Sequence, residues 1–266
     1  MAEATILGLH IYPVKSLGGI SLSESAVERR GLLHDRRWIL ADGEGMFMTQ
    51  RSSPRLALFR TAIDADGLRI ISPSGQVLSV PLAAAGPGRS VRVWKDEIEG
   101  LLVSEEVDAW LTRELGTNCS LLYMDDDTIR PTNPEFTQPG DIVGFADAYP
   151  ILVISEASLA ALNARLDEPL PMNRFRPNIV LAGCLPHAED ECSRLRMGDL
   201  TLRAAKQCAR CAVTTTDQAT AEVGVEPLRT LAKYRLRDQK IYFGAYFVPE
   251  QAGVLTVGQP VCLEFR

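Results

Sequence analysis

The sequence has no apolar run of eighteen or more residues, which is about the length that a membrane-spanning helix needs. Its first residues lack the basic and apolar regions of a signal peptide, because the alternation typical of a strand begins almost at once at Thr5. Internal repeats and low-complexity tracts are also missing. We therefore expect a cytoplasmic protein with reduced thiols and no membrane partner.

Cysteine and net positive charge are both scarce. Six scattered cysteines in 266 residues are too few for a disulfide scaffold, and their spacing matches neither the plant-type nor the bacterial ferredoxin pattern. We therefore expect no iron–sulfur cluster held by this chain. The net charge of −6 gives no general attraction to nucleic acid, so any anion site must be a local cluster of Lys and Arg.

Short predicted strands fill the first third of the chain. They are separated by turn-forming residues at Gly18-Gly19, at 42–45 and at 64–67, and strands are expected at 37–41 and 46–49 on either side of the second turn. This spacing is typical of a barrel or sandwich. Ser104 and Ser155 each suit the N-cap of a helix that follows, and Gly116 suits the end of the first of these helices. Hydrophobic residues make up 46% of the chain, which is ordinary for a globular protein with a substantial core.

A cysteine pair, Cys208 and Cys211, runs into the β-branched segment 213–216. Two cysteines at this spacing can be a redox dithiol, half of a zinc site, a ligand of a softer metal, or buried strand residues. The β-branched segment predicts an extended chain, whereas a redox dithiol opens a helix. Cys184 and His187 could complete a zinc site, although Arg210 between the thiols suits an anionic partner better than a dication.

A second stretch contains Arg174, Arg176 and Asn178 just before a clear strand signal. Guanidinium groups bind phosphate and other oxyanions through paired hydrogen bonds, although two solvated arginines at a strand entrance would give the same pattern. Lys15 and Ser16 follow the first predicted strand, and Ser155 stands at a helix N-terminus with free N–H groups.

These stretches, in this order and spacing, resemble the MOSC family, which is named from the C-terminal domain of molybdenum cofactor sulfurases. The segments 12–16 and 34–38 are similar to the β-barrel domain that precedes MOSC in the mitochondrial amidoxime-reducing component and its bacterial relatives. The similarity runs from about Leu7 to the end of the chain. It implies an α+β, β-barrel-centred fold with a few helices, in which an N-terminal β-barrel-like domain (1–120) packs on a MOSC β-barrel domain (121–266).

The resemblance also implies a cofactor, molybdenum bound by molybdopterin, and a set of site residues. Cys211 would be the thiolate ligand of the metal and the catalytic residue, with Arg210 beside it helping to keep the thiol ionised. Cys208 would be a neighbour of the site, and Tyr246 is expected in the core, with a place facing the site as the alternative. The residues implied to bind the cofactor are Lys15, Ser16, Arg36, Ser155, Arg176, Asn178 and Arg210.

The implied reaction is the reduction of small N-hydroxylated substrates, amidoximes and hydroxylamines, by transfer of their oxygen to reduced molybdenum and its release as water. Some bacterial members carry a fused ferredoxin domain that this sequence lacks. We therefore expect a separate electron donor, either a ferredoxin or a cytochrome b5-like protein with its reductase. The alternative is a non-catalytic carrier of sulfur or of the molybdenum cofactor that uses Cys211 or Cys208.

Overall fold

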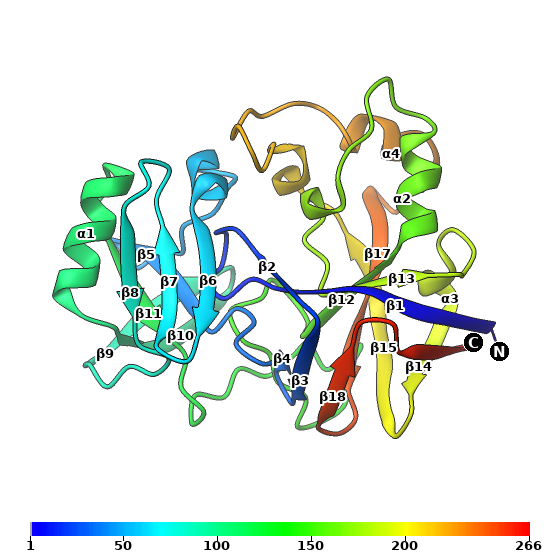
Figure 1. The fold of residues 1–266 in the computed structure, drawn as a ribbon, viewed down its shortest axis with the longest axis horizontal. Helices are drawn as coiled ribbons and strands as arrows, with labels where there is room; N and C mark the ends of the chain where they lie inside the picture. The colour runs from blue at the N-terminus through cyan, green and yellow to red at the C-terminus, as the bar shows by residue number, and fades with distance from the viewer. Residues whose placement is uncertain (1) are drawn as a thin grey trace.

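The computed structural model describes residues 2–266. Two lobes lie side by side along the long axis of the molecule, a barrel lobe that contains both chain termini and a lobe of small sheets that carries α1 (Figure 1). We call the second one the small-sheet lobe. Across residues 2–266, none of the helices is long and apolar enough to cross a lipid bilayer.

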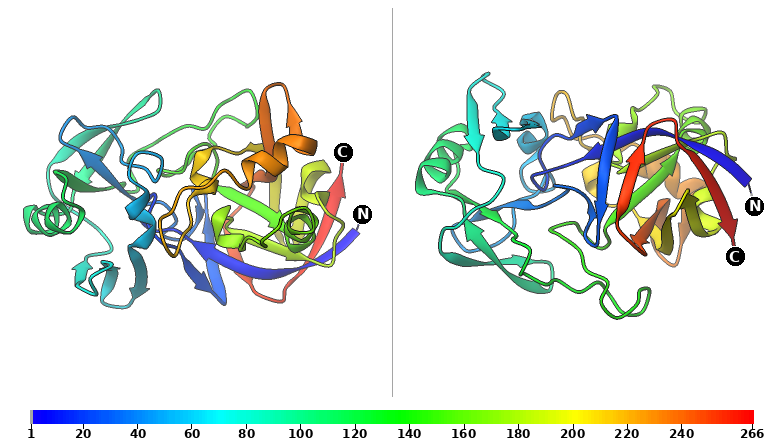
Figure 2. Two further views of the ribbon diagram at one scale, coloured as in Figure 1. Left: turned by 90° about the horizontal axis from the view of Figure 1, so that it is seen from above. Right: turned by 60° about the horizontal axis from the view of Figure 1, so that its bottom comes forward.

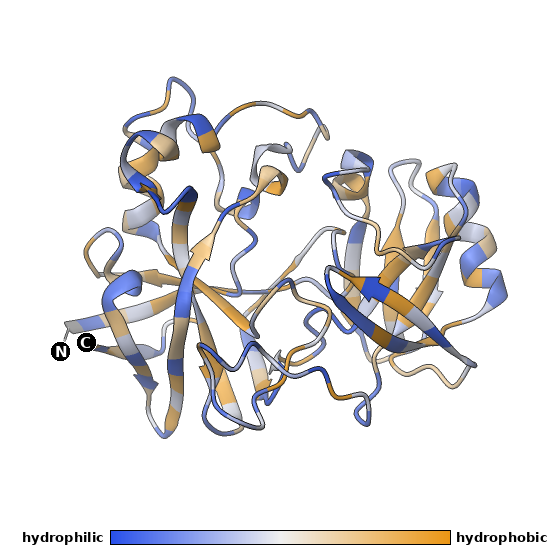
Figure 3. Cartoon of the chain, turned by 180° about the vertical axis from the view of Figure 1, so that it is seen from behind, coloured by the Kyte–Doolittle hydropathy of each residue, from blue (hydrophilic) through white to orange (hydrophobic). Residues whose placement is uncertain are grey.

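Seven strands close the barrel, which confirms the predicted barrel-centred α+β fold. β12 and β13 pair in parallel, and the other neighbours around the barrel pair antiparallel. Apolar side chains such as Ile6, Leu195 and Phe247 fill its core. Hydrophobic and hydrophilic residues alternate along these strands, as expected where one face of a strand is buried (Figure 3). In barrel order the strands are β12 (Ile151–Ser155), β13 (Ile179–Ala182), β1 (Ala2–Ile11), β19 (Pro260–Phe265), β14 (Cys192–Met197), β15 (Leu200–Ala209) and β17 (Lys240–Pro249).

The first strand of the chain, β1, is part of this barrel and pairs with β13 and β19. The segments that follow β1 also lie against the barrel, because β2 (Ile20–Leu22) pairs with β1, and β3 (Glu24–Glu28) pairs with β18 (Gly253–Thr256) and β4 (Gly31–Leu32). The boundary at residue 120 stays a prediction. In space, the beginning of the chain belongs with the barrel.

The small-sheet lobe contains two sheets and one helix. Its core includes Trp38 and Phe59, both fully buried. The predicted helix α1 (Glu105–Leu115) is confirmed, with the Ser104 hydroxyl accepting a hydrogen bond from Val107 N at 3.2 Å. The predicted strand at 46–49 is wrong, since this segment makes only isolated bridges at Met46 and Phe47. The sheets are β5 (Trp38–Asp42), β11 (Cys119–Tyr123), β10 (Asp96–Leu102) and β9 (Gly88–Val93), and then β6 (Arg60–Asp64), β7 (Gly67–Ile71) and β8 (Val77–Val80).

Short helices and loops complete the barrel lobe, and several of them lie on the side that faces the small-sheet lobe (Figure 2). Ser155 caps α2, as predicted, by accepting a hydrogen bond from Ser158 N at 3.1 Å. The remaining elements of the barrel lobe are α2 (Glu156–Asn163), α3 (Ala188–Glu191), α4 (Leu228–Arg235), β16 (Leu236–Arg237) and the 3-10 segments η2 (Met172–Arg174) and η3 (Ala212–Thr215). The 3-10 segment η1 (Pro54–Leu58) packs Leu56 into the core of the small-sheet lobe.

Candidate functional site

A cavity lies where the two lobes meet, and both lobes supply its walls. Of the eight predicted site residues, seven line it: Lys15, Ser16, Arg36, Arg176, Asn178, Arg210 and Cys211. It is also lined by residues that the sequence did not single out, including Thr49, Arg51, Asp147 and Thr214, and by Tyr246, which was expected in the core.

Cys211 lies at the point where the chain leaves β15 and enters η3. The expected extended conformation of 213–216 is wrong, because residues 212–215 form a 3-10 turn instead. The hydroxyls of Thr214 and Thr215 donate to the carbonyls of Cys211 and Ala212 at 3.0 and 2.8 Å, and these local bonds outweigh the β preference of threonine. The turn leaves Cys211 half-buried at the cavity wall.

Cys208 also lines the cavity but is only 2% exposed, and it is bonded to a different arginine, Arg210. Arg210 Nη1 donates to Cys208 Sγ at 2.9 Å, and Arg210 Nη2 donates to the carbonyl of Phe175 at 2.6 Å. The guanidinium of Arg210 is therefore hydrogen-bonded to Cys208 and to the backbone. The expectation that Arg210 helps to keep the Cys211 thiol ionised stays a prediction. Burial, and next the nearby Cys208, raise the pKa of Tyr246 well above its usual value.

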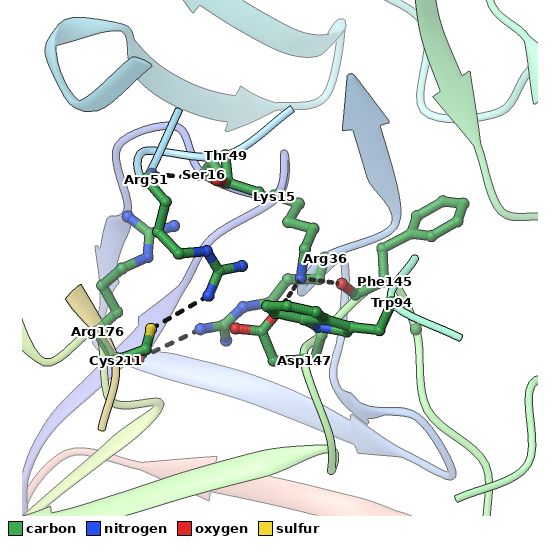
Figure 4. Close-up of polar contacts among 12 residues, drawn as sticks. Lys15, Ser16, Arg36, Thr49, Arg51, Trp94, Phe145, Asp147, Arg176 and Cys211 are labelled. Carbon is green, nitrogen blue, oxygen red and sulfur yellow. Dashed lines mark hydrogen bonds and ion pairs between the residues drawn. The ribbon is translucent and has the colours of Figure 1, made fainter. Parts of the chain in front are cut away.

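The arginine that contacts Cys211 is Arg51, from the loop after β5. Arg51 Nη1 donates to Cys211 Sγ at 3.3 Å, and its guanidinium carbon lies 4.2 Å from the ring centre of Trp94 (Figure 4). Nothing in the local sequence pattern connects Arg51 with a thiol 160 residues away along the chain. Only the packing of the two lobes brings these groups together.

Two arginines enclose the ring of Tyr12. The guanidinium carbons of Arg36 and Arg176 lie 4.4 and 4.1 Å from its ring centre. Arg36 is paired with Asp35 at 2.6 Å, whereas within residues 2–266 the guanidinium of Arg176 has no hydrogen-bond or ion-pair partner. Burial lowers the pKa of Arg176 to about 10. Arg176 is thus a buried cation that lines the cavity without an anion in ion-pair contact, although Asp35 and Asp147 lie near enough to favour its charged form.

Lys15 is already paired inside the protein. Its Nζ donates to Asp147 Oδ1 at 2.6 Å and to the carbonyl of Phe145 at 2.7 Å. Burial lowers the pKa of Lys15, and Asp147 opposes that shift. Partial burial acts to raise the pKa of Asp147, but the charge and hydrogen bond of Lys15 outweigh it and hold that pKa well below its usual range.

Asn178 and Ser16 make contacts within the protein as well. Asn178 Oδ1 accepts from Arg36 Nη1 and from Leu152 N, both at 3.1 Å, and its amide nitrogen donates to the carbonyl of His10 at 3.1 Å. This amide therefore orients Arg36 towards the cavity. The Ser16 hydroxyl reaches the carbonyl of Met48 at 3.4 Å.

Ser155 does not line the cavity. It is fully buried at the end of β12, where its hydroxyl lies 2.6 Å from Ser158 Oγ and its N–H donates to Glu189 Oε1 at 3.2 Å. Its local contacts account for the side chain as a helix cap. A role for Ser155 in cofactor binding stays a prediction.

The zinc alternative required Cys184 and His187 to meet the cysteine pair. Within residues 2–266, no group of three or more His, Cys, Asp or Glu side chains is arranged to hold a metal ion. Cys184 packs against the barrel core, and the His187 ring lies 5.9 Å from the ring of Phe243. The alternative four-ligand zinc site is therefore not assembled in the described part of the chain.

Comparison with known proteins decides the family. A family model described as the MOSC N-terminal beta barrel domain matches residues 3–118, and the MOSC domain model matches residues 141–262. The chain belongs to the MOSC family. Both MOSC regions line the cavity, since Lys15, Arg36 and Arg51 come from the first match and Arg176 and Cys211 from the second.

Curated relatives of this MOSC protein extend over nearly its whole length. It is 37% identical to the mitochondrial amidoxime-reducing component 1 of Homo sapiens over 278 residues, which cover 97% of this chain and 82% of the relative. It is 34% identical to the mitochondrial amidoxime reducing component 2 of Rattus norvegicus with the same coverage. Component 1 of Xenopus laevis is 32% identical and covers 95% of this chain, with 80% of the relative matched.

Proposed function

We propose that this MOSC protein is a molybdenum-cofactor oxidoreductase in which Cys211 is the protein ligand of the metal. The observation that carries the proposal is that one cavity contains both the half-buried Cys211 thiol and the buried cation of Arg176, which has no ion-pair partner among residues 2–266. A soft thiolate suits molybdenum, and a buried guanidinium suits an anionic group on the same ligand. When bound, the cofactor supplies a two-electron couple and an oxygen-transfer centre.

The charge of the cavity supports an anionic ligand. Five cationic side chains line it (Lys15, Arg36, Arg51, Arg176 and Arg210), but only one carboxylate, Asp147, among the residues 2–266 that the structure describes. The chain as a whole carries a net charge of −6, so this excess of positive charge is local. Burying a cation without an anion costs free energy, and a phosphate would compensate Arg176.

The cavity residues would have three roles: binding the anionic part of the cofactor, holding the metal, and contacting the substrate. Arg176 would bind the anionic part of the cofactor, with Arg36 held beside it by Asn178 and Asp35. Cys211 would hold the metal at the cavity wall. The Lys15 and Asp147 pair lies at the edge of the same cavity, where it can donate and accept hydrogen bonds to a polar substrate. The packing of the two lobes would limit access of water.

The proposed substrates are small N-hydroxylated compounds, amidoximes and hydroxylamines. Three relatives named as amidoxime-reducing components, 32 to 37% identical over almost the whole chain, support this proposal. We further propose that electrons come from a separate ferredoxin or a cytochrome b5-like protein with its reductase, and that the protein works in the cytoplasm.

Turnover of an amidoxime such as benzamidoxime with reduced viologen as electron donor tests this function directly. We expect turnover by the protein purified with molybdenum. In Cys211→Ala the turnover rate should fall by at least about 100-fold, because even the loss of a group that only supports a metal ligand typically costs about 10- to 100-fold in metal affinity or activity. Cys262→Ala, a change at a half-buried cysteine outside the cavity, is the matched control and should keep full activity.

The same assay separates the enzyme from the carrier alternative. A protein that contains molybdenum but turns over neither amidoximes nor hydroxylamines would contradict the enzyme and favour a carrier that uses Cys211. Cys208 is poorly suited to carry a persulfide, since it is only 2% exposed.

A further inference from the structure

Arg51 combines three contacts that suit it to act on the Cys211 sulfur. We infer that Arg51 is a positioning residue that donates a charge-assisted hydrogen bond to the Cys211 thiolate and so sets the reduction potential of the metal bound there. The inference rests on the proposed function, because it assigns a task to Arg51 only when Cys211 holds molybdenum. It concerns the electronic properties of the site, beyond the binding of the cofactor.

The contact of Arg51 with sulfur is its principal polar contact. Nη1 lies 3.3 Å from Cys211 Sγ, and no carboxylate lies within ion-pair distance of the guanidinium among residues 2–266. An arginine placed only for stability would be expected to pair with an acidic side chain or a carbonyl. Arg210 shows that pattern, because its guanidinium is shared between Cys208 and the carbonyl of Phe175.

The guanidinium of Arg51 is held in place from its other side. Its carbon stacks 4.2 Å from the ring centre of Trp94, and the indole of Trp94 is fixed by a hydrogen bond from Nε1 to Asp147 Oδ1 at 3.2 Å and by an edge contact with Phe47. The backbone N–H of Arg51 donates to Thr49 Oγ1 at 3.1 Å. Figure 4 shows the guanidinium between the thiol and the indole.

The backbone at Trp94 has an unusual conformation that places its indole beside Arg51. Trp94 lies in the turn between β9 and β10 with a left-handed φ of 58°, and its side chain stays 48% exposed. A bulky residue in this backbone region is strained and persists where its surroundings fix it. The turn therefore presents an exposed indole that orients Arg51 towards the sulfur.

A hydrogen bond from a cation to a metal-bound thiolate withdraws electron density from sulfur. The thiolate then donates less charge to the metal, which favours the reduced state and raises the reduction potential. Removal of Arg51 should therefore lower the potential. We expect a change of about tenfold in the one-electron equilibrium constant, which corresponds to about 59 mV.

The experiment is a redox titration of the molybdenum-loaded protein, followed by the electron paramagnetic resonance signal of Mo(V), in wild type, Arg51→Gln, Arg51→Lys and Trp94→Ala. Arg51→Gln should lower the midpoint potential by about 59 mV and shift the g values. Arg51→Lys and Trp94→Ala should give smaller shifts in the same direction, because a cation remains but its position is less fixed. Arg55→Gln, at an exposed arginine of η1, is the matched control and should behave as wild type.

The outcomes separate this inference from the proposed function. Wild-type potentials and g values in molybdenum-loaded Arg51→Gln would overturn the inference and leave the function intact. If Arg51→Gln loses its metal, the midpoint potentials of Arg51→Lys and Trp94→Ala are compared with that of wild type instead. Wild-type potentials in both variants would then overturn the inference. A wild-type protein that binds no molybdenum would overturn the proposed function and this inference together.

Discussion

At the scale of single residues, the two cysteines of one short motif have different surroundings. Both line the cavity, but Cys208 is almost fully buried in an apolar cluster with Phe243 and bonded to Arg210, whereas Cys211 is half-buried and contacts Arg51. Their spacing alone is the same as in a redox dithiol or half a zinc site. The difference arises because β15 ends between them and a 3-10 turn begins.

The Lys15 and Asp147 pair makes a prediction for pH dependence. A carboxyl whose pKa is lower in the folded than in the unfolded state contributes stability above its unfolded pKa, and this contribution is lost as the pH falls towards the folded pKa. Since Lys15 holds the pKa of Asp147 well below its usual range, the free energy of unfolding of wild type should fall as the pH drops below about 5.

Urea unfolding between pH 3 and pH 7 measures this effect. Asp147→Asn should be less stable than wild type at pH 7, because Lys15 keeps a buried charge without its anion, and should lose less stability on acidification. Asp66→Asn, at an exposed turn residue, is the control. Equal acid sensitivity of Asp147→Asn and wild type would contradict the role of the pair.

At the scale of elements, the closing strand β17 passes very close to β12. Gly244 has a left-handed φ of 79°, and a Cβ there would lie 2.6 Å from Ile154 Cγ1 and 2.9 Å from the carbonyl of Val153. The missing side chain therefore allows β12 and β17 to close the barrel beside the cysteine pair.

Gly244→Ala should destabilise the protein by at least about 3 kcal/mol, since it adds a steric clash to backbone strain. Gly198→Ala is the matched control, because Gly198 also has a left-handed φ, 62°, but a Cβ there would meet nothing within 4 Å. Its cost should be about 1 kcal/mol, from the conformation alone. Thermal and urea unfolding of both variants measure the difference, and equal losses would rule out the clash.

Local sequence patterns correctly predicted those elements that are determined by interactions between neighbouring residues. The cap of α1 at Ser104 and its end at Gly116 follow from side-chain capping and a left-handed glycine, and both are confirmed. The segment 213–216 is turned because hydroxyl-to-carbonyl bonds compete with β propensity, and that competition is not visible in residue type alone. The segment 46–49 contributes Thr49 to the cavity from a loop, because its pairing with β5 and β9 is limited to single bridges at Phe47 and Met46.

At the scale of the whole molecule, the cavity depends on contacts between lobes. The side-chain amides of Gln50 and Gln218 exchange hydrogen bonds at 3.1 and 2.9 Å, and Arg36 reaches Asn178 at 3.1 Å. Arg51 contacts Cys211, and Trp94 contacts Asp147, only through this packing. Sequence resemblance led to seven of the residues that line the cavity, but the partners of these residues required the three-dimensional arrangement.

The place of β1 predicts how fragments of the chain behave. A fragment of residues 121–266 lacks β1, so β13 and β19 would each lose a strand partner and the barrel would stay open. We expect this fragment to be aggregated or without cooperative unfolding by circular dichroism. Co-expression of residues 1–120 as a separate chain should restore folding, since it supplies β1. A fragment 121–266 that unfolds cooperatively on its own would contradict this account.

The most direct test of the central claim is the content of molybdenum, zinc and pterin in the purified protein, compared between wild type, Cys211→Ala and Cys262→Ala. We predict molybdenum and pterin close to one per chain in wild type and in Cys262→Ala, and loss of molybdenum or an altered metal coordination in Cys211→Ala. Zinc without pterin, or unchanged molybdenum and coordination in Cys211→Ala, would contradict the assignment of Cys211 as the metal ligand.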